Sequence, residues 1–153
     1  MSRVAVVTGG ASGIGLGVAR AFLADGHRVA VFDRNAPIEE VDALALEVDV
    51  ADRSSVDALA ATARDAYGAV HVLCNNAGVS HRRRGIDATH EDWVWMLGVN
   101  LWGVIHGVEA FLPAMLESGD EAHIVNTASM NGIVPSAFSA MYSTGKYLSL
   151  IHI

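Results

Sequence analysis

The sequence predicts an α/β fold in which a parallel sheet carries helices on both faces. Short runs of β-branched and other apolar residues alternate with longer stretches of helical period, the pattern of βαβ units. A glycine-rich turn separates the first apolar run from the first helical stretch. With 153 residues, 52% hydrophobic and 18% charged, the chain is long and apolar enough for one domain with a buried core.

The expected elements follow in order along the chain. Strands are predicted where short apolar runs occur, at 4–7, 28–32, 46–50, 70–74 and 123–126. Helices are predicted at 13–25, from an N-cap at 52 to about 67, from about 90 to 116 with an interruption at Gly98, and from about 138 onward. The connection before the third strand, through Pro37, is unusually short.

Composition excludes several classes of partner. A net charge of −7 argues against nucleic acid or an anionic membrane as the main partner, and the basic cluster at 82–84 is too short to change this. No apolar run reaches the roughly 18 residues that span a bilayer, and the first residues lack the long apolar stretch of a secretory signal. The single Cys74 excludes an internal disulfide framework. We therefore expect a cytoplasmic protein without nucleic-acid or membrane partners.

The glycine-rich turn is the first candidate site, with the sequence Thr8-Gly9-Gly10-Ala11-Ser12-Gly13-Ile14-Gly15. A phosphate reaches the N–H groups of a helix N-terminus only where no side chain blocks it. Glycines at 9, 13 and 15 provide the tight turn, the close approach and the close helix–strand packing of a dinucleotide-binding loop. We predict cofactor contacts from Gly9, Ser12, Gly13, Ile14 and Gly15. The alternative is a plain glycine-rich turn, which the position between a strand and an amphipathic helix disfavours.

Asp33 is the second candidate, 18 residues after Gly15 at the end of the second predicted strand. A carboxylate there accepts hydrogen bonds from the ribose hydroxyls of NAD and repels the 2′-phosphate of NADP. The neighbouring Arg34 offsets this preference if it pairs with that phosphate, and Asp33 can instead cap a loop. The sequence favours NAD over NADP.

Tyr142 and Lys146 are the third candidate, because four residues on a helix place both side chains on one face. A nearby ammonium stabilises the phenolate form that a tyrosine needs to act as a base near neutral pH. Ser129 lies 13 residues before Tyr142, at the end of the fifth predicted strand. Hydroxyl donors around a carbonyl beside a nicotinamide suit hydride transfer, since the protein orients and polarises while the cofactor does the redox chemistry.

These motifs together resemble those of the short-chain dehydrogenases/reductases. They occur in family order and spacing over almost the whole chain: the glycine loop, Asn75-Asn76-Ala77-Gly78, Val99-Asn100, Ser129 and Tyr142-Ser143-Thr144-Gly145-Lys146. The resemblance implies a Rossmann-like doubly wound sheet and an enzyme that moves a hydride between NAD(H) and an alcohol or ketone. It also implies that the whole protein is a homodimer or homotetramer.

The resemblance assigns roles to individual residues. Tyr142 is the general acid/base, and Ser129 positions the substrate oxygen. Lys146 holds the nicotinamide ribose and favours the phenolate, while Asn100 anchors a water in the proton relay. The further cofactor contacts that it implies are Tyr142 itself, Asp49 and Val50 beside the adenine, and Asn75, Ala77 and Gly78 near the ribose.

Other polar residues have competing interpretations. His106 and Glu109 are spaced i, i+3 and could bind a metal, but without a third ligand a packed or solvated helix face is favoured. Asn75 and Asn76 could serve as turn formers. Cys74, within an apolar strand, is expected in the core.

The chain departs from the family pattern near residue 147. Members continue through two further strands and a substrate-binding loop, so we interpret residues 1–147 as an incomplete nucleotide-binding domain that carries the catalytic residues. The last six residues, Leu-Ser-Leu-Ile-His-Ile, are also the translation of CTGTCTCTTATACACATC, an end sequence of a library-preparation transposase. Our hypothesis is that residues 148–153 are a sequencing or cloning scar.

Three functions remain open at this point. The first is an NAD-dependent oxidoreductase acting on a small alcohol or carbonyl substrate. The second is a truncated nucleotide-binding fragment without turnover. The third, a sugar-nucleotide epimerase or dehydratase, is disfavoured because those enzymes usually carry a Thr-Gly-x-x-Gly-x-x-Gly loop, which differs from the loop here.

Overall fold

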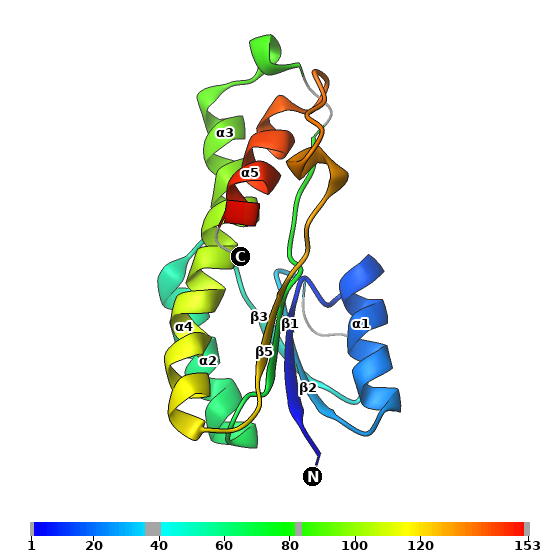
Figure 1. The fold of residues 1–153 in the computed structure, drawn as a ribbon, viewed down its shortest axis with the longest axis vertical. Coiled ribbons are helices and arrows are strands. Elements are labelled where there is room, and N and C mark those ends of the chain that lie inside the picture. Colours follow the sequence, from blue (N-terminus) through cyan, green and yellow to red (C-terminus); the bar gives the residue numbers. More distant parts are fainter. Residues whose placement is uncertain (1, 36–40, 82–83, 152–153) are drawn as a thin grey trace.

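The computed structural model describes residues 2–35, 41–81 and 84–151; Pro37, Arg82, Arg83 and residues 152–153 lie outside this part. Within it, five parallel strands form one sheet in the order β3-β2-β1-β4-β5 (Figure 1). The strands are β1 (Val4–Thr8), β2 (Arg28–Asp33), β3 (Leu44–Glu47), β4 (Val72–Asn75) and β5 (His123–Asn126). The predicted doubly wound α/β class is confirmed.

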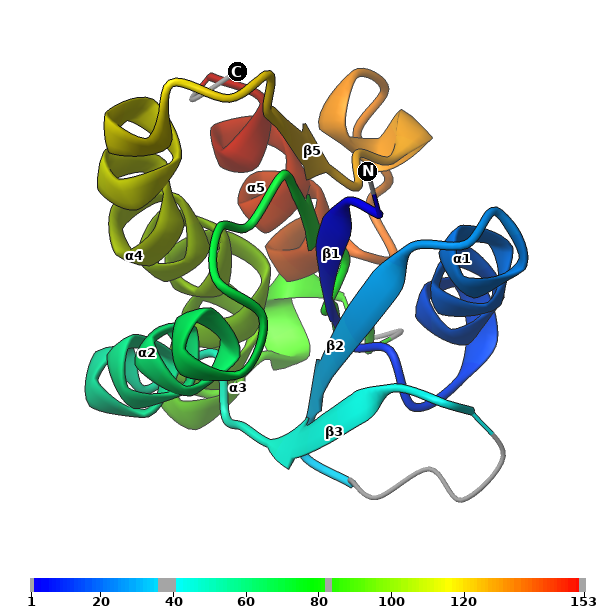
Figure 2. The same cartoon turned by 90° about the horizontal axis from the view of Figure 1, so that it is seen from below.

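Helices cover both faces of the sheet. Figure 2 shows α1 (Gly13–Ala24) on one side and α2 (Arg53–Tyr67) with α4 (Gly103–Ser118) on the other. α3 (His90–Leu97) continues into α4 through a π-helical segment, η2 (Gly98–Trp102), so the interruption expected at Gly98 is present. The remaining elements are α5 (Ala140–Ile151) and the short 3-10 turns η1 (Gly85–Asp87) and η3 (Met130–Gly132).

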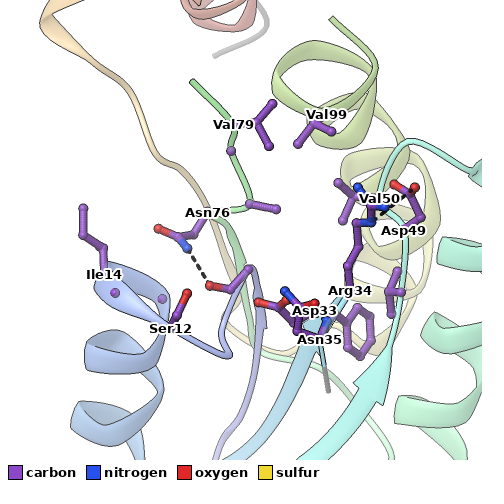
Figure 3. A pocket seen from close by; sticks show the side chains of 17 residues that line it. Ser12, Ile14, Asp33, Arg34, Asn35, Asp49, Val50, Asn76, Val79 and Val99 are labelled. Carbon is purple, nitrogen blue, oxygen red and sulfur yellow. Dashed lines mark hydrogen bonds and ion pairs between the residues drawn. The ribbon is translucent and has the colours of Figure 1, made fainter. Parts of the chain in front are cut away.

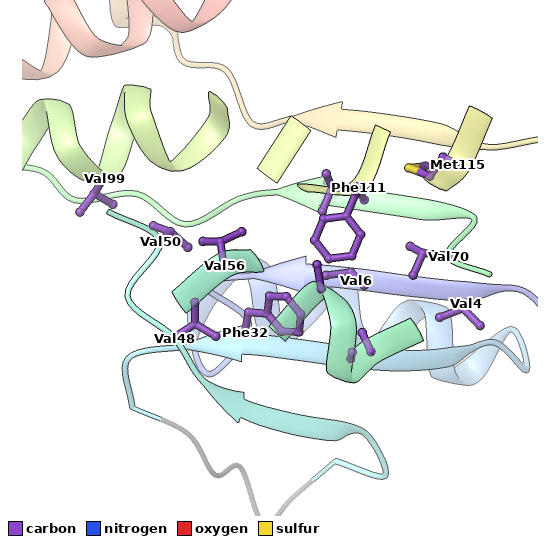
Figure 4. Close-up of a cluster of buried hydrophobic side chains, with 14 residues drawn as sticks. Val4, Val6, Phe32, Val48, Val50, Val56, Val70, Val99, Phe111 and Met115 are labelled. Atoms are coloured by element: carbon purple, nitrogen blue, oxygen red, sulfur yellow. The ribbon is translucent and has the colours of Figure 1, made fainter. Parts of the chain in front are cut away.

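Alternation along β1 divides the core into two layers. All five residues of β1 are buried, as expected for a parallel strand between two helix layers. Val4 and Val6 pack with Phe32, Phe111 and other residues on the α2 and α4 side (Figure 4). Ala5 and Val7 pack with Ala19 of α1 and with Cys74 on the opposite side, which confirms the expected core position of the cysteine.

The third strand lies two residues earlier than predicted. β3 pairs with β2 from Leu44 opposite Ala30 to Glu47 opposite Asp33, and the prediction of 46–50 is wrong. The apolar run continues past the point where β2 ends, so its last residues have no partner strand. Val48 donates the final hydrogen bond, 2.9 Å, to the carbonyl oxygen of Asp33. The run 48–50 therefore leaves the sheet and becomes part of a cavity wall.

The last helix begins at Ala140 rather than near Phe138. The backbone of Ser143 donates to the Ser139 carbonyl oxygen at 2.8 Å, which starts the helical hydrogen-bond pattern there. The helix then runs unbroken through Ile151. A helical conformation gives no information on the codons that encode these residues. The nucleotide sequence is therefore still the test of the scar hypothesis for 148–153.

The helical stretch His90–Ser118 meets the length and composition criteria for a membrane-crossing helix, with a mean hydropathy of 1.3 over its most apolar window. Polar residues interrupt this stretch, so it contains no unbroken apolar run of the length that the sequence analysis required. Within the fold, 44% of that window is buried. Phe111 and Met115 face the sheet as core residues, so part of the apolar face of this stretch packs in the protein interior.

Candidate active site

The glycine loop joins β1 to α1 with a geometry that only glycine permits at three positions. Gly9 and Gly13 have φ of 64° and 52°, in the left-handed region. A Cβ at Gly9 would lie 2.7 Å from the Ala77 Cα, and one at Gly15 would collide with the Gly9 carbonyl oxygen. The loop therefore packs backbone against backbone and leaves the N-terminus of α1 uncovered by side chains, the arrangement that accepts a phosphate.

Thr8 fastens this loop to the segment that follows β4. Its hydroxyl oxygen accepts hydrogen bonds from the backbone N–H groups of Asn76 and Ala77, both at 3.0 Å. The Asn76 side chain donates to the Thr8 carbonyl oxygen at 3.1 Å. The carboxyl ends of β1 and β4 are thereby held together, and Asn76, which the sequence suggested only as a turn former, orders both loops.

A cavity of about 660 Å³ opens at these carboxyl ends (Figure 3). Seventeen residues line it, from the loops after β1, β2, β3 and β4, the end of β2, the start of α1 and η2: Gly9, Ser12, Gly13, Ile14, Gly15, Phe32, Asp33, Arg34, Asn35, Val48, Asp49, Val50, Asn76, Ala77, Gly78, Val79 and Val99. Ligands of open α/β sheets bind in this crevice beyond the strand ends.

Asp33 lies in the cavity wall beside the glycine loop. One carboxylate oxygen accepts from the Ala11 N–H at 2.9 Å, and the other accepts from the Asn35 N–H at 3.0 Å. These bonds fix the carboxylate against the loop, and each oxygen retains further lone pairs for a ligand. The Arg34 guanidinium lies 3.8 Å from an Asp49 carboxylate oxygen and is engaged there.

A second cavity, of about 770 Å³, lies beside Tyr142. Its lining is mostly polar and comes from the loop after β4, η1, η3 and the start of α5: Ser80, Arg84, Asp87, Asn131, Ser136, Phe138, Ser139 and Tyr142. The Asn131 side chain donates to the Ser139 hydroxyl at 3.0 Å, and Arg84 forms an ion pair of 2.7 Å with Asp87. Val79 lines the first cavity and its neighbour Ser80 lines the second.

Two buried polar side chains lie behind the cavity walls. The Lys146 ammonium donates to the Thr127 carbonyl oxygen at 2.7 Å and is 6.0 Å from the centre of the Tyr142 ring. Burial lowers the pKa of Lys146. Asn100 is fully buried in η2, where its side chain accepts from the Val79 N–H at 2.9 Å and donates to the Val79 carbonyl at 2.8 Å. Asn100 therefore fixes the segment that separates the two cavities.

Most of the predicted cofactor residues meet in the first cavity. Those on its wall are Gly9, Ser12, Gly13, Ile14, Gly15, Asp33, Asp49, Val50, Ala77 and Gly78. Asn75 is not on the wall, because its side chain is buried at the sheet and donates to the Asn126 side chain at 2.8 Å. Ser129 lines neither cavity; its hydroxyl accepts from the Asn131 N–H at 3.2 Å.

Phe32, Val48 and Val79 also line the cavity, and the sequence analysis did not select them. Each is an apolar residue at or just beyond a strand end, a position that sequence alone assigns to the core. The signal in the sequence that could have identified them is that each directly neighbours a predicted cofactor residue, Asp33, Asp49 or Gly78.

His106 and Glu109 on α4, the two residues that could bind a metal, each contact a different partner. His106 Nδ1 lies 2.9 Å from the Val50 carbonyl oxygen, and Glu109 pairs with Arg53. Among residues 2–35, 41–81 and 84–151, no group of three potential metal ligands occurs. His106 and Glu109 therefore have separate partners, and the interpretation of a packed or solvated helix face stays a prediction.

The described residues form a doubly wound α/β domain with a cavity at the carboxyl ends of its strands. The sequence profile of the short chain dehydrogenase family matches residues 3–148. The chain therefore belongs to the short-chain dehydrogenase family.

Named relatives are dehydrogenases. The chain is 36% identical to C alpha-dehydrogenase of Sphingobium sp. over 97% of its own length and 52% of the relative's. It is 39% identical to 2-(R)-hydroxypropyl-CoM dehydrogenase of Xanthobacter autotrophicus, over 95% of the chain and 64% of the relative. A short chain dehydrogenase/reductase from Burkholderia phymatum, solved with NAD, superposes with a TM-score of 0.93 at 34% identity, covering 99% of this chain and 57% of that one. The chain thus spans between about half and two thirds of the length of these relatives.

Proposed function

We propose that the whole protein is an NAD-dependent dehydrogenase that transfers a hydride between NAD(H) and a small alcohol or ketone. The observation that carries the proposal is the adjacency of the two cavities. The first has the uncovered helix N-terminus and fixed carboxylate that suit a dinucleotide, and the second contains Tyr142. Consecutive residues, Val79 and Ser80, line one cavity each, so a cofactor in the first has its reactive end beside a substrate in the second.

The residues of the first cavity fit a nicotinamide dinucleotide. The α1 N-terminus, free of side chains at Gly13, suits the pyrophosphate, and the Asp33 carboxylate suits the adenosine ribose. When bound, such a cofactor supplies or accepts the hydride.

Tyr142 exchanges the proton in the proposed reaction. Its hydroxyl donates a proton to the oxygen of a ketone during reduction, and its phenolate accepts the proton of an alcohol during oxidation. Lys146, one helical turn away, favours the phenolate and holds the nicotinamide ribose. Ser129 positions the substrate oxygen, and Asn100 anchors a water in the proton relay. The role of Tyr142 rests on its position in the wall of the second cavity and on the family resemblance, whereas the roles of Ser129, Lys146 and Asn100 rest on the family resemblance.

We propose NAD rather than NADP as the cofactor. The Asp33 carboxylate faces the cavity and repels a 2′-phosphate, while Arg34, the residue that could pair with this phosphate, is engaged with Asp49. The charged group that would face the 2′ position of the ribose is therefore the Asp33 carboxylate, which is negative.

The whole protein is also proposed to be a homodimer or homotetramer. Large apolar side chains are exposed on η2, α4 and α5, including Trp102 at 52%, Leu116 at 73% and Tyr147 at 57%. Exposed apolar side chains of this size are candidate contacts with a second copy of the chain. Light scattering coupled to size exclusion tests this assembly, and a monodisperse monomer contradicts it.

Calorimetric titration with NAD⁺ and NADP⁺, followed by NADH absorbance with a panel of secondary alcohols, tests the function. The proposal expects tighter binding of NAD⁺ and production of NADH. NAD⁺ binding with no turnover of any alcohol supports the alternative, a nucleotide-binding fragment. Absence of NAD⁺ binding contradicts both functions.

A further inference from the structure

His106 is a buried histidine that the proposed chemistry does not use. Its side chain lies on α4 and the residue is 9% exposed. The ring nitrogen Nδ1 is 2.9 Å from the carbonyl oxygen of Val50. Because a carbonyl oxygen only accepts hydrogen bonds, Nδ1 carries the hydrogen in this contact. The bond joins α4 to a residue 56 positions earlier, in the loop after β3.

Val50 belongs to the cavity wall but not to the sheet. Pairing between β2 and β3 ends at Asp33 and Glu47, so no strand ladder holds Val50. On its N-terminal side, the Asp49 side chain accepts from the Ala51 N–H at 3.0 Å, a bond within the same loop. A wall residue in this position needs support from another element.

Helix α4 supplies that support at three points. A Cβ added to Gly103 would lie 2.8 Å from Val50 Cγ2, so the helix backbone touches the Val50 side chain. His106, on the same face one turn later, holds the Val50 carbonyl. One further turn along, Glu109 pairs with Arg53 at the start of α2. The Trp102 ring lies against His106, with ring centres 6.0 Å apart.

We propose that His106 is a positioning residue for the adenosine end of the cofactor, acting through the Val50 carbonyl. The inference rests on the proposed function, since it assumes that the first cavity binds NAD. Asp33 marks the adenosine end of that cavity, and Val50 lines the same cavity beside Asp49 (Figure 3). Loss of the His106 bond leaves a buried carbonyl unpaired and frees the wall to move, which weakens adenosine binding without touching the nicotinamide end.

Three substitutions at one position separate hydrogen bonding from packing. Asn places a donor N–H near the position of histidine Nδ1, Gln places its donor farther out, and Leu has none. His106→Leu and His106→Gln are expected to raise the Kd of NAD⁺ about tenfold, the size of one net hydrogen bond. His106→Asn is expected to bind like the wild type. His123→Leu, which removes an exposed histidine on β5, serves as the control.

The experiment is calorimetric titration of each variant of the full chain with NAD⁺ and with ADP-ribose, which keeps the adenosine and lacks the nicotinamide. The inference expects the same fold-change in Kd for both probes. An irreversibly misfolded fraction lowers the number of binding sites and leaves Kd unchanged. A reversibly unfolded fraction raises the apparent Kd but is detected in a melting curve recorded without ligand, so both effects are distinguished from loss of the hydrogen bond. Equal affinity of all three His106 variants, or a failure of Asn to rescue, overturns the inference while wild-type NAD⁺ binding keeps the proposed function. A wild-type chain that binds neither probe overturns both.

A second pair of variants tests the same wall without altering His106. Gly103→Ala pushes a methyl group into Val50 and is expected to weaken ADP-ribose binding, whereas Gly98→Ala meets only Ala51 at an ordinary 3.4 Å and is expected to leave it unchanged. Equal affinities for Gly103→Ala and Gly98→Ala contradict a role for the Val50 wall.

Discussion

The region around β1, beside the proposed cofactor cavity, and the region around β5 and η3, beside the proposed substrate cavity, differ in how fully their side chains are buried. Around β1, strands lie on both sides and helices cover both faces, and all five β1 residues are buried. Around β5 and η3, large apolar side chains are exposed, among them Val125 at 50%, Met130 at 70% and Ile133 at 68%. The described chain therefore covers the strand that leads into the proposed cofactor cavity, whereas apolar side chains near the proposed substrate cavity are exposed. Cofactor binding and substrate turnover are expected to be separable.

Tyr142→Phe is expected to give the largest separation between loss of turnover and loss of cofactor binding. The ring still packs, but the hydroxyl that exchanges the proton is absent, so kcat of the whole protein falls about 10²- to 10⁴-fold while the Kd for NAD⁺ stays the same. Stopped-flow absorbance and calorimetry measure the two quantities. Tyr147→Phe, at an exposed tyrosine of the same helix, is the control and keeps the wild-type rate. A Tyr142→Phe enzyme with most of its rate contradicts the assignment.

Asp33→Ala is expected to act on cofactor binding alone. Loss of a charged acceptor costs about 1.5–3 kcal/mol, which weakens NAD⁺ binding about 10- to 100-fold. NADP⁺ loses a repulsion rather than an attraction, so the gap between the two cofactors narrows. Titration of both cofactors against both proteins checks this. An equal loss for NAD⁺ and NADP⁺ shows that Asp33 only supports the loop.

Gly15→Ala and Gly17→Ala form a matched pair on one helix. A Cβ at Gly15 collides with the Gly9 carbonyl oxygen, while a Cβ at Gly17 meets nothing within 4 Å. Gly15→Ala is expected to lower the free energy of unfolding by about 1–3 kcal/mol. Gly17→Ala is expected to raise it by up to ~1 kcal/mol, because alanine favours the helix. Urea unfolding measures both, and a change of the same sign in the two variants contradicts the loop packing.

Asp52 gives the smallest expected effect. The Ser54 hydroxyl and the Ser54 N–H donate to its carboxylate and hold the pKa of Asp52 below its ordinary value of 3.8. A depressed folded-state pKa stabilises the fold above 3.8, and this contribution is lost as pH falls through the lower value. Asp52→Asn keeps a side-chain acceptor but does not ionise. Its melting temperature should therefore lie below that of the wild type at pH 7 and approach it in acid; a gap that stays constant with pH contradicts this.

The contrast between Gly9 and Ser129 shows how far motifs reach. The Gly9 loop was predictable because its partners lie within a few residues or at the end of the adjacent strand, and backbone sterics fix its shape. Ser129 precedes η3 and Tyr142 lies near the start of α5, and the placement of both depends on packing between distant elements. Their spacing in the sequence predicted that Ser129 and Tyr142 belong to one site. It did not predict that, of these two residues, Tyr142 lines the second cavity and Ser129 does not.

Sequence by itself determined the parallel α/β class and the polar and glycine residues at the carboxyl ends of the strands. Those features follow from local periodicity, turn chemistry and residue type. The tertiary structure alone decided that β3 ends at Glu47, that 48–50 becomes a cavity wall, and that His106 holds it. A strand extends only as far as its neighbour offers N–H and C=O groups, and that limit is set by β2, which lies elsewhere in the sequence. Apolar pattern cannot record where a partner strand stops.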